Sequence, residues 1–468
     1  MFCALTLATA TAQEPAPPAP ETDFWTEVRR IDGIDAVVLA DGRRLRLAGL
    51  SLPAEAVRPK DLESRLIDLL RARLIGGRTW IEPEGANAAG DDVDLTGVAR
   101  PTAGAPSANA EALEQGLAVL SYRTPQTRAF AALQAAAATA QRERRGWFDR
   151  PHPAGLEPLP YLNGAVLGLH YQEDRFEYHS HLDELADLGF RHLCLLLSAF
   201  AQDATSSTIR LDHPRTVSDE RLLDTIAYAK GKGMTVLLLP IVLLEDPGEN
   251  DWRGTLRPRD EGAFWLSYDG FLSHYLDLAE AAGADAFSVG SEFSSLERRH
   301  DAWRRIIANA RGRFRGALTY SANWDHVHVP RFFGLLDFVG MTAYFSLSDK
   351  DDPSPDELTA GWQKVAKDLN RAVGMLGKPV VFTELGYPSQ NGCNRDPWNY
   401  YMARDDIDVE EQRQCFEAFL RVAPEMRFLG GAYWYDFFDD GGPEDHSYSP
   451  RGKPALAAWE RWAAYSPK

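Results

Sequence analysis

Two glutamates in the chain each come directly after an apolar run of strand character. Glu292 ends the run in AFSVGSEFSSLE, and Glu384 ends the run in KPVVFTELGYPS. A carboxylate that follows a buried strand is costly to desolvate, and two carboxylates facing the same space push each other's pKa values apart. One can then donate a proton while the other attacks or accepts one, which is the chemistry that cleavage of a glycosidic bond requires.

Apolar strands must hold these glutamates in place. From residue 161 to the end of the chain, eight apolar runs alternate with segments of helical period, several of which end near Gly, as helices do. This alternation indicates a parallel sheet covered by helices, and eight units over roughly 300 residues predict an α/β fold of the (β/α)₈ TIM-barrel type. The runs are GAVLGLHY, HLCLLLSAF, MTVLLLPIVLL, AFSVGSEF, GALTYSANW, FVGMTAYF, KPVVFTELGYPS and GGAYWYDFF.

The barrel prediction brings the two glutamates together. Glu292 closes the fourth run and Glu384 the seventh. The active site of a (β/α)₈ barrel lies at the C-terminal ends of its strands, so we expect both carboxylates at the same mouth. No GxGxxG motif opens a helix, and no CxxC pair suggests zinc. We therefore expect no cofactor and no metal.

Here the sequence resembles glycoside hydrolase clan A, in which the acid/base ends strand four and the nucleophile ends strand seven. The segments DWRGTLRP, VGSEFSSLE, MTAYFSL and FTELGYPS are similar to the signature of family 113, which is known for β-mannanase activity. The resemblance covers about residues 160–465. It implies a retaining hydrolase of a neutral β-linked glycan, mannan first, with Glu292 as acid/base and Glu384 as nucleophile. Ser291 departs from the clan, where many members have Asn.

The resemblance also implies residues that bind substrate. Tyr344 ends strand six, where a clan tyrosine often hydrogen-bonds the nucleophile; simple aromatic packing is the alternative. Trp434 ends strand eight, the usual place for an aromatic platform under the sugar, and a core position is its alternative. The expected substrate-binding residues are Trp252, Arg253, Asn323, Trp324, Tyr344 and Trp434.

Three histidines and a tyrosine carry weaker signals. His170 and Tyr171 follow the first strand and are candidates for a subsite. His326 and His328 stand two apart, but a metal site needs at least one more ligand, so a solvated loop is the better interpretation.

The net charge limits the classes of binding partner, and the cysteine content limits the possible disulfides. The 468 residues carry a formal net charge of -18, which repels phosphate backbones and anionic membranes. We therefore expect an oligo- or polysaccharide substrate and no nucleic acid. The four cysteines are too few for a disulfide scaffold, but Cys393 and Cys415 are close enough in sequence to form a disulfide if the chain is exported.

The chain divides into four predicted segments. Residues 1–23 combine a short apolar run, like a signal-peptide remnant, with a Pro-rich linker. The run is too short to span a bilayer, so we expect export to a periplasm or the extracellular space. Residues 24–150 predict a small β-barrel with helices, 151–160 a linker, and 161–468 the TIM barrel.

The first domain resembles the thermonuclease-like (SNase-like) fold, an OB-type barrel, through IDGIDAVVLADGRRLRLAGLSLP, LIGGRTWIEP, ALEQGLAVL and ERRGWFD. Arg46 matches the first catalytic arginine of that family. Ser51, Ala54 and Val98 replace its aspartate, its general-base glutamate and its second arginine. Without those carboxylates the domain cannot assemble the calcium site, so we interpret it as a noncatalytic module of unknown partner.

Two functions from different classes remain open from the sequence. The first is a glycoside hydrolase. The second is a noncatalytic glycan-binding or scaffolding protein that keeps a glycosidase-like barrel. The presence of both Glu292 and Glu384 favours the enzyme.

Overall fold

The computed structural model describes residues 22–84, 94–121, 128–149, 159–170, 178–374, 376–399, 406–438 and 440–467. The chain folds into two compact units, one made of the residues up to 51 with 60–140, and the other of 52–59 with the residues from 141 onward. The predicted signal remnant lies almost wholly outside the described residues, as does most of the predicted linker. None of the described helices has the length and apolar composition that a bilayer crossing needs.

The first unit contains a closed barrel of five strands in the order β1-β2-β3-β6-β5. Neighbouring strands are antiparallel except for β3 and β6, which are parallel. A five-stranded barrel with helices is consistent with the predicted OB-type domain. Its elements are β1 (Phe24–Ile31), β2 (Ala36–Leu39), β3 (Arg44–Leu47), β4 (Leu50–Ser51), α1 (Leu62–Leu74), β5 (Arg78–Pro83), β6 (Leu95–Arg100), α2 (Ala108–Glu114), β7 (Val119–Leu120) and α3 (Phe130–Glu143).

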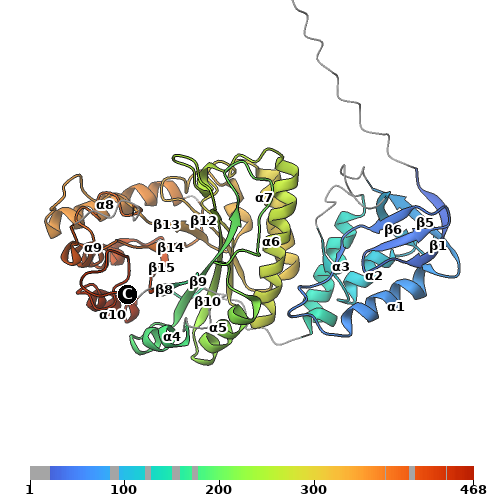
Figure 1. The fold of residues 1–468 in the computed structure, drawn as a ribbon, viewed down its shortest axis with the longest axis horizontal. Coiled ribbons are helices and arrows are strands. Elements are labelled where there is room, and N and C mark those ends of the chain that lie inside the picture. The colour runs from blue at the N-terminus through green and yellow to red at the C-terminus, as the bar shows by residue number, and fades with distance from the viewer. Residues whose placement is uncertain are drawn as a thin grey trace, which may run out of the picture. The chain divides into compact units, whose positions relative to one another are not determined.

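The second unit is a closed barrel of eight parallel strands, which confirms the predicted TIM barrel (Figure 1). Each predicted apolar run contains one strand, because continuous apolar segments suit a sheet that is buried on both faces. The strands are β8 (Leu162–Leu169), β9 (His192–Ala201), β10 (Thr235–Leu244), β11 (Ala286–Ser291), β12 (Ala317–Ala322), β13 (Val339–Thr342), β14 (Val380–Leu385) and β15 (Leu429–Trp434).

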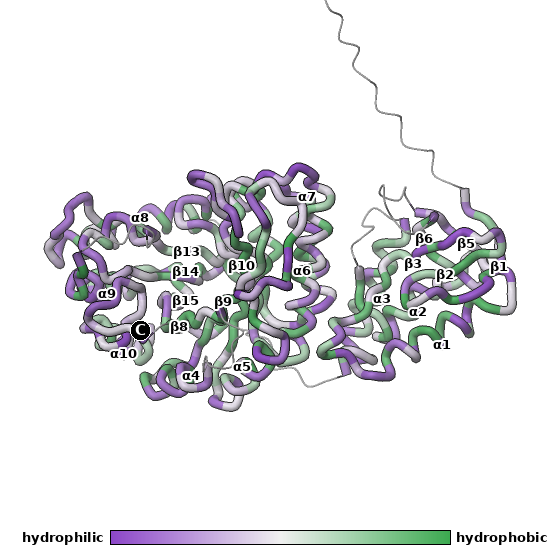
Figure 2. The backbone as a smooth tube through the Cα atoms, in the orientation of Figure 1, coloured by the Kyte–Doolittle hydropathy of each residue, from purple (hydrophilic) through white to green (hydrophobic). Residues whose placement is uncertain are grey.

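Helices follow most of the strands, and Figure 2 shows α8 as mainly hydrophilic and β10 as hydrophobic. A short 3-10 helix, η3, stands between β12 and β13 in place of an α-helix. The helical elements are α4 (Tyr178–Asp187), α5 (Asp219–Gly231), η2 (Arg253–Thr255), α6 (Glu261–Ala282), α7 (His300–Arg313), η3 (Arg331–Leu335), α8 (Pro355–Val373), α9 (Val409–Val422) and α10 (Leu456–Ala463).

Alternate residues of each strand point to opposite sides of the barrel wall. In β9, Leu195 and Leu197 pack in the large cluster formed with the outer helices, whereas Cys194 and Leu196 pack in a smaller cluster inside the barrel. The same alternation continues to the strand ends. A shift of one residue therefore decides whether a side chain faces the helices or the barrel interior.

Candidate active site

Glu292 directly follows β11 and has a left-handed backbone conformation, with φ of 55°. Such a conformation costs energy for a residue with a side chain and persists where its surroundings enforce it. Here the main-chain N–H of Glu292 donates to the carbonyl of Ser321 on the neighbouring strand, at 2.8 Å. The residue is only 4% exposed. The carboxylate at the end of β11 is thus buried on a residue whose backbone is strained.

Both carboxylate oxygens of Glu292 accept hydrogen bonds. Arg253, from η2 after β10, donates from its guanidinium to Oε2 at 2.5 Å. Thr342, the last residue of β13, donates its hydroxyl to Oε1 at 2.7 Å. Arg253 is one of the residues predicted from the sequence, whereas Thr342 is not. The structure therefore brings η2 and the ends of β11 and β13 together around this carboxylate.

Glu384 lies in β14 and is equally buried, with 3% of its surface exposed. The hydroxyl of Tyr344 donates to Oε2 of Glu384 at 2.8 Å, as the resemblance implies. Oε1 is buried and has no hydrogen-bond partner among the described residues. One oxygen of this carboxyl group is therefore held and the other is left without a donor.

Burial and, to a smaller extent, the negative charge of Glu292 raise the pKa of Glu384 from 4.5 to about 7. The charge of Arg253 and the Tyr344 hydroxyl oppose this rise. Glu384 therefore binds a proton as the pH falls through about 7, well above the pH at which an ordinary glutamate does. Such a pair has the two functional groups that acid-assisted nucleophilic displacement needs.

The remaining predicted residues flank the carboxylates. Oδ1 of Asn323 lies 3.4 Å from the Thr342 hydroxyl, and its side-chain amide donates to Asp325 at 2.8 Å. Trp324 is half-buried next to it, and the guanidinium of Arg253 lies 5.9 Å from the ring centre of Trp252. The structure thus gathers Asn323 and Arg253 at the glutamates and places both tryptophans immediately beside those two residues.

Trp434, in contrast, does not face the mouth. It is fully buried, stacks on Phe416 of α9 at 4.4 Å between ring centres, and lies parallel to Trp462 of α10 at 5.5 Å. The strand pleat explains this, because Trp434 faces the helices while its neighbours Tyr433 and Tyr435 belong to the interior cluster. The expected platform is thus core packing, and Tyr435 lies on the site side, 6.2 Å from the ring of Tyr344.

A second buried carboxylate network supports the loop after Glu292. Glu297 is fully buried and accepts hydrogen bonds from the Tyr320 hydroxyl at 2.9 Å and from His326 Nδ1 at 3.0 Å. The Tyr320 hydroxyl in turn accepts the main-chain N–H of Phe293, which follows Glu292, at 2.9 Å. His326 thus contacts a carboxylate. This network is not among the sequence predictions, although the acidic Glu297 follows Glu292 closely in SEFSSLE.

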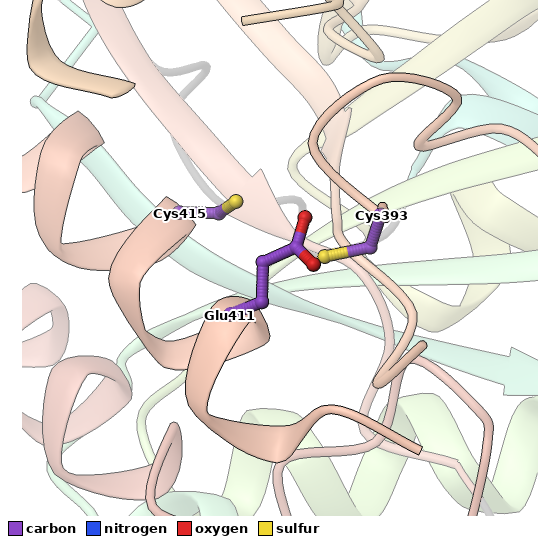
Figure 3. A group of neighbouring side chains, drawn as sticks. All are labelled: Cys393, Glu411 and Cys415. Carbon is purple, nitrogen blue, oxygen red and sulfur yellow. The ribbon is translucent and has the colours of Figure 1, made fainter. Parts of the chain in front are cut away.

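Two predicted histidines remain, and of these His328 is exposed. His170 is half-buried, its pKa is lowered to about 4 mainly by desolvation, and Tyr171 lies outside the described residues. Cys393 and Cys415 are free thiols, so the expected disulfide is not formed. Their sulfurs and a carboxylate oxygen of Glu411 all lie within 4.8 Å of one another, and burial raises the pKa of both thiols (Figure 3).

Both carboxylate oxygens of Glu411 in this cluster accept hydrogen bonds. One oxygen accepts the main-chain N–H of Gly392 at 2.6 Å, and the other accepts the main-chain and side-chain N–H groups of Asn394 at 2.9 and 2.7 Å. Glu411 lies in the first turn of α9, the helix that also carries Cys415, whereas Cys393 lies on the loop after β14 (Figure 3). These contacts attach that loop to the helix.

The chain matches the sequence model of Glycoside Hydrolase Family 113 over residues 169–452. A solved GH113 β-1,4-mannanase is 23% identical with a TM-score of 0.60, and the match covers 66% of this chain and all of that one. The GH113 β-mannanase from Alicyclobacillus acidocaldarius, solved in complex with ManMIm, is 25% identical with a TM-score of 0.59, over 65% of this chain and 98% of that one. No curated protein matches the chain.

Proposed function

The chain belongs to glycoside hydrolase family 113, and from this membership we propose that it is a retaining hydrolase that cleaves a neutral β-linked glycan by double displacement. The observation that carries the proposal is the buried, electrostatically coupled pair Glu292 and Glu384 at the mouth of the barrel. Two carboxyls that share one proton can supply both the acid and the nucleophile of this reaction.

In the proposed mechanism, Glu384 attacks the anomeric carbon while Glu292 protonates the leaving oxygen. Water then hydrolyses the glycosyl ester, with Glu292 accepting a proton from it. The Tyr344 hydroxyl fixes one oxygen of Glu384, which leaves the unpartnered Oε1 to attack. The raised pKa of Glu384 favours the proton on this residue in the free enzyme, so the proton must reside on Glu292 before attack.

Arg253 and Thr342 position the acid/base in this proposal. They hold both oxygens of Glu292, and the Arg253 charge counteracts the repulsion between the two carboxylates. That charge favours the state in which Glu384 is ionised, which the attack requires. Asn323, Trp324 and Trp252 are proposed to contact the substrate from the edges of the site.

Mannan is the first candidate substrate. The support is that the two solved structures described above are β-mannanases, one of them 25% identical to this chain. A neutral glycan also suits the half-buried tryptophans beside the glutamates, because apolar sugar faces pack on indole rings. The net charge of -18 is compatible with a neutral substrate.

The proposal also assigns a role to each segment of the chain. We assign residues 161–468 to the hydrolase domain and 24–150 to a noncatalytic SNase-like module, joined by a linker at 151–160. Val98 is fully buried in β6, so the position of the second catalytic arginine is part of the core. Residues 1–23 are proposed to direct export to a periplasm or the extracellular space.

Release of reducing ends from mannans, β-glucans and xylans tests the function. We expect hydrolysis of at least one of them by the wild type, mannan first, and none by the Glu384→Gln variant. Glu425→Gln is the matched control. Glu425 is exposed and lies in the segment that precedes β15, whereas the site lies where the strands end. A wild-type protein that cleaves none of these polymers would overturn the proposal.

A further inference from the structure

Trp398, on the loop after β14, is a large apolar side chain with 40% of its surface exposed. Its ring lies 5.8 Å from that of Trp324, and the two planes differ by 20°. Nearly parallel rings in contact hold each other in one orientation, at the small extra gain typical of aromatic pairs. The exposed indole is thus held against a half-buried one.

The tryptophan pair begins at the catalytic carboxyls. Trp324 follows Asn323, whose Oδ1 is 3.4 Å from the Thr342 hydroxyl that binds Glu292. The Trp324 ring also contacts Phe345, at 5.8 Å between ring centres, and Phe345 directly follows the tyrosine that binds Glu384. Trp324 thus lies beside the residues that bind both glutamates, and Trp398 extends from it to the solvent-exposed surface.

The loop that carries Trp398 is firmly attached to its neighbours. The carbonyl of Asn394 accepts the N–H of Leu347 at 2.8 Å, and the carbonyl of Pro397 accepts the buried Tyr448 hydroxyl at 2.6 Å. Glu411 accepts two main-chain N–H groups of the same loop. An exposed side chain on an anchored loop loses little further freedom when it binds a ligand.

We propose that Trp398, supported by Trp324, is an aromatic platform that binds a sugar residue of the glycan beyond those at the cleaved bond. The inference rests on the proposed function and adds a preference for long chains to it. A pyranose ring has faces of C–H groups, which an indole removes from water without needing a hydroxyl partner. An aryl disaccharide is too short to reach the platform, whereas a hexasaccharide reaches it.

The test compares kcat and KM on manno-, cello- and xylohexaose with those on the corresponding aryl disaccharides. For the hexaose that the wild type cleaves, Trp398→Ala should raise KM about 3- to 10-fold, the range of one aromatic contact, with kcat nearly unchanged. KM for the aryl disaccharide should stay the same. Trp398→Phe, which keeps an aromatic face, should restore most of the hexaose affinity.

Leu335→Ala is the matched control, since Leu335 is 47% exposed but precedes β13, at the opposite end of the strand from the site. It should change neither KM. An unchanged hexaose KM in Trp398→Ala, or an equal rise for both substrates, would overturn the platform and leave the proposed function standing. A wild type that cleaves no hexaose would overturn the proposed function and the platform with it.

Discussion

Two buried glutamates of the barrel unit, Glu384 and Glu411, differ in how their oxygens are used. They are 3% and 5% exposed, and burial raises the pKa of each. All of the Glu411 carboxylate is bound, by N–H groups of Gly392 and Asn394. Glu384 has one bound oxygen and one that is buried with no partner among the described residues.

This difference distinguishes a structural carboxylate from the carboxylate that we propose to be catalytic. A buried acceptor that receives all its hydrogen bonds recovers most of its desolvation cost, so it stabilises the fold. A buried carboxyl with an unsatisfied oxygen and a negative neighbour destabilises the fold, and such costs concentrate at functional sites. Glu384 and Glu411 should therefore respond in opposite ways to the same substitution.

The largest expected effect is on activity. Glu384→Gln should lower kcat/KM at least about 10⁴-fold, because the reaction loses its nucleophile. Glu411→Gln should retain most activity and lose about 1–3 kcal/mol of stability, because an amide nitrogen then faces an N–H donor. Kinetics and thermal unfolding of both variants measure this. Equal activity losses would remove the distinction between the two glutamates.

Glu292→Gln should show an effect that depends on the leaving group. Hydrolysis of the polysaccharide should fall about 10²- to 10⁴-fold, the usual contribution of a general acid. The first step on an activated aryl glycoside needs no protonation, so a burst of the aryl product should persist. Rapid kinetics with a dinitrophenyl glycoside measures the burst. A loss of burst equal to that in Glu384→Gln would contradict the acid/base assignment.

The stabilities of the wild type and of Glu384→Gln should depend differently on pH. The folded pKa of Glu384, about 7, exceeds its ordinary 4.5, so the folded state binds the proton more tightly and loses stability as pH rises between these values. Gln carries no such charge. Glu384→Gln should match the wild type at pH 4.5 and be more stable above pH 7, by about 3 kcal/mol at most.

Thermal unfolding of the wild type, Glu384→Gln and the exposed control Glu425→Gln at pH 4.5 and pH 8 provides the measurement. The control should follow the wild type at both pH values. A Glu384→Gln variant that gains nothing at pH 8 would show that the buried carboxyl carries no electrostatic cost.

The smallest expected effect concerns the thiols beside Glu411. Cys393 is 3% exposed and Cys415 fully buried, and burial raises the pKa of both, so little thiolate forms at pH 8. Iodoacetamide should modify neither residue in the folded protein within an hour and both after unfolding. Mass spectrometry of the digests checks this. Rapid modification in the folded state would show that the contacts between Glu411 and the loop after β14 break transiently.

The sequence identified the glutamates because each directly follows an apolar run, and a barrel brings such strand ends together. Tyr344 was predicted from the clan resemblance, in which a tyrosine at the end of strand six often hydrogen-bonds the nucleophile. Thr342 was not predicted, because an uncharged residue within an apolar run gives no sign that its hydroxyl binds Glu292. Trp434 was misplaced because AYWYDFF has aromatic residues on both faces of the strand, and the pattern does not show which face is inside.

Product stereochemistry tests the central claim most directly. Proton NMR during wild-type hydrolysis of the preferred hexasaccharide records which anomer appears first, before mutarotation. Double displacement through Glu384 predicts the β-anomer as the first product, since two inversions at the anomeric carbon retain the configuration. Initial appearance of the α-anomer would contradict Glu384 as a nucleophile and would require it to act as a general base on water.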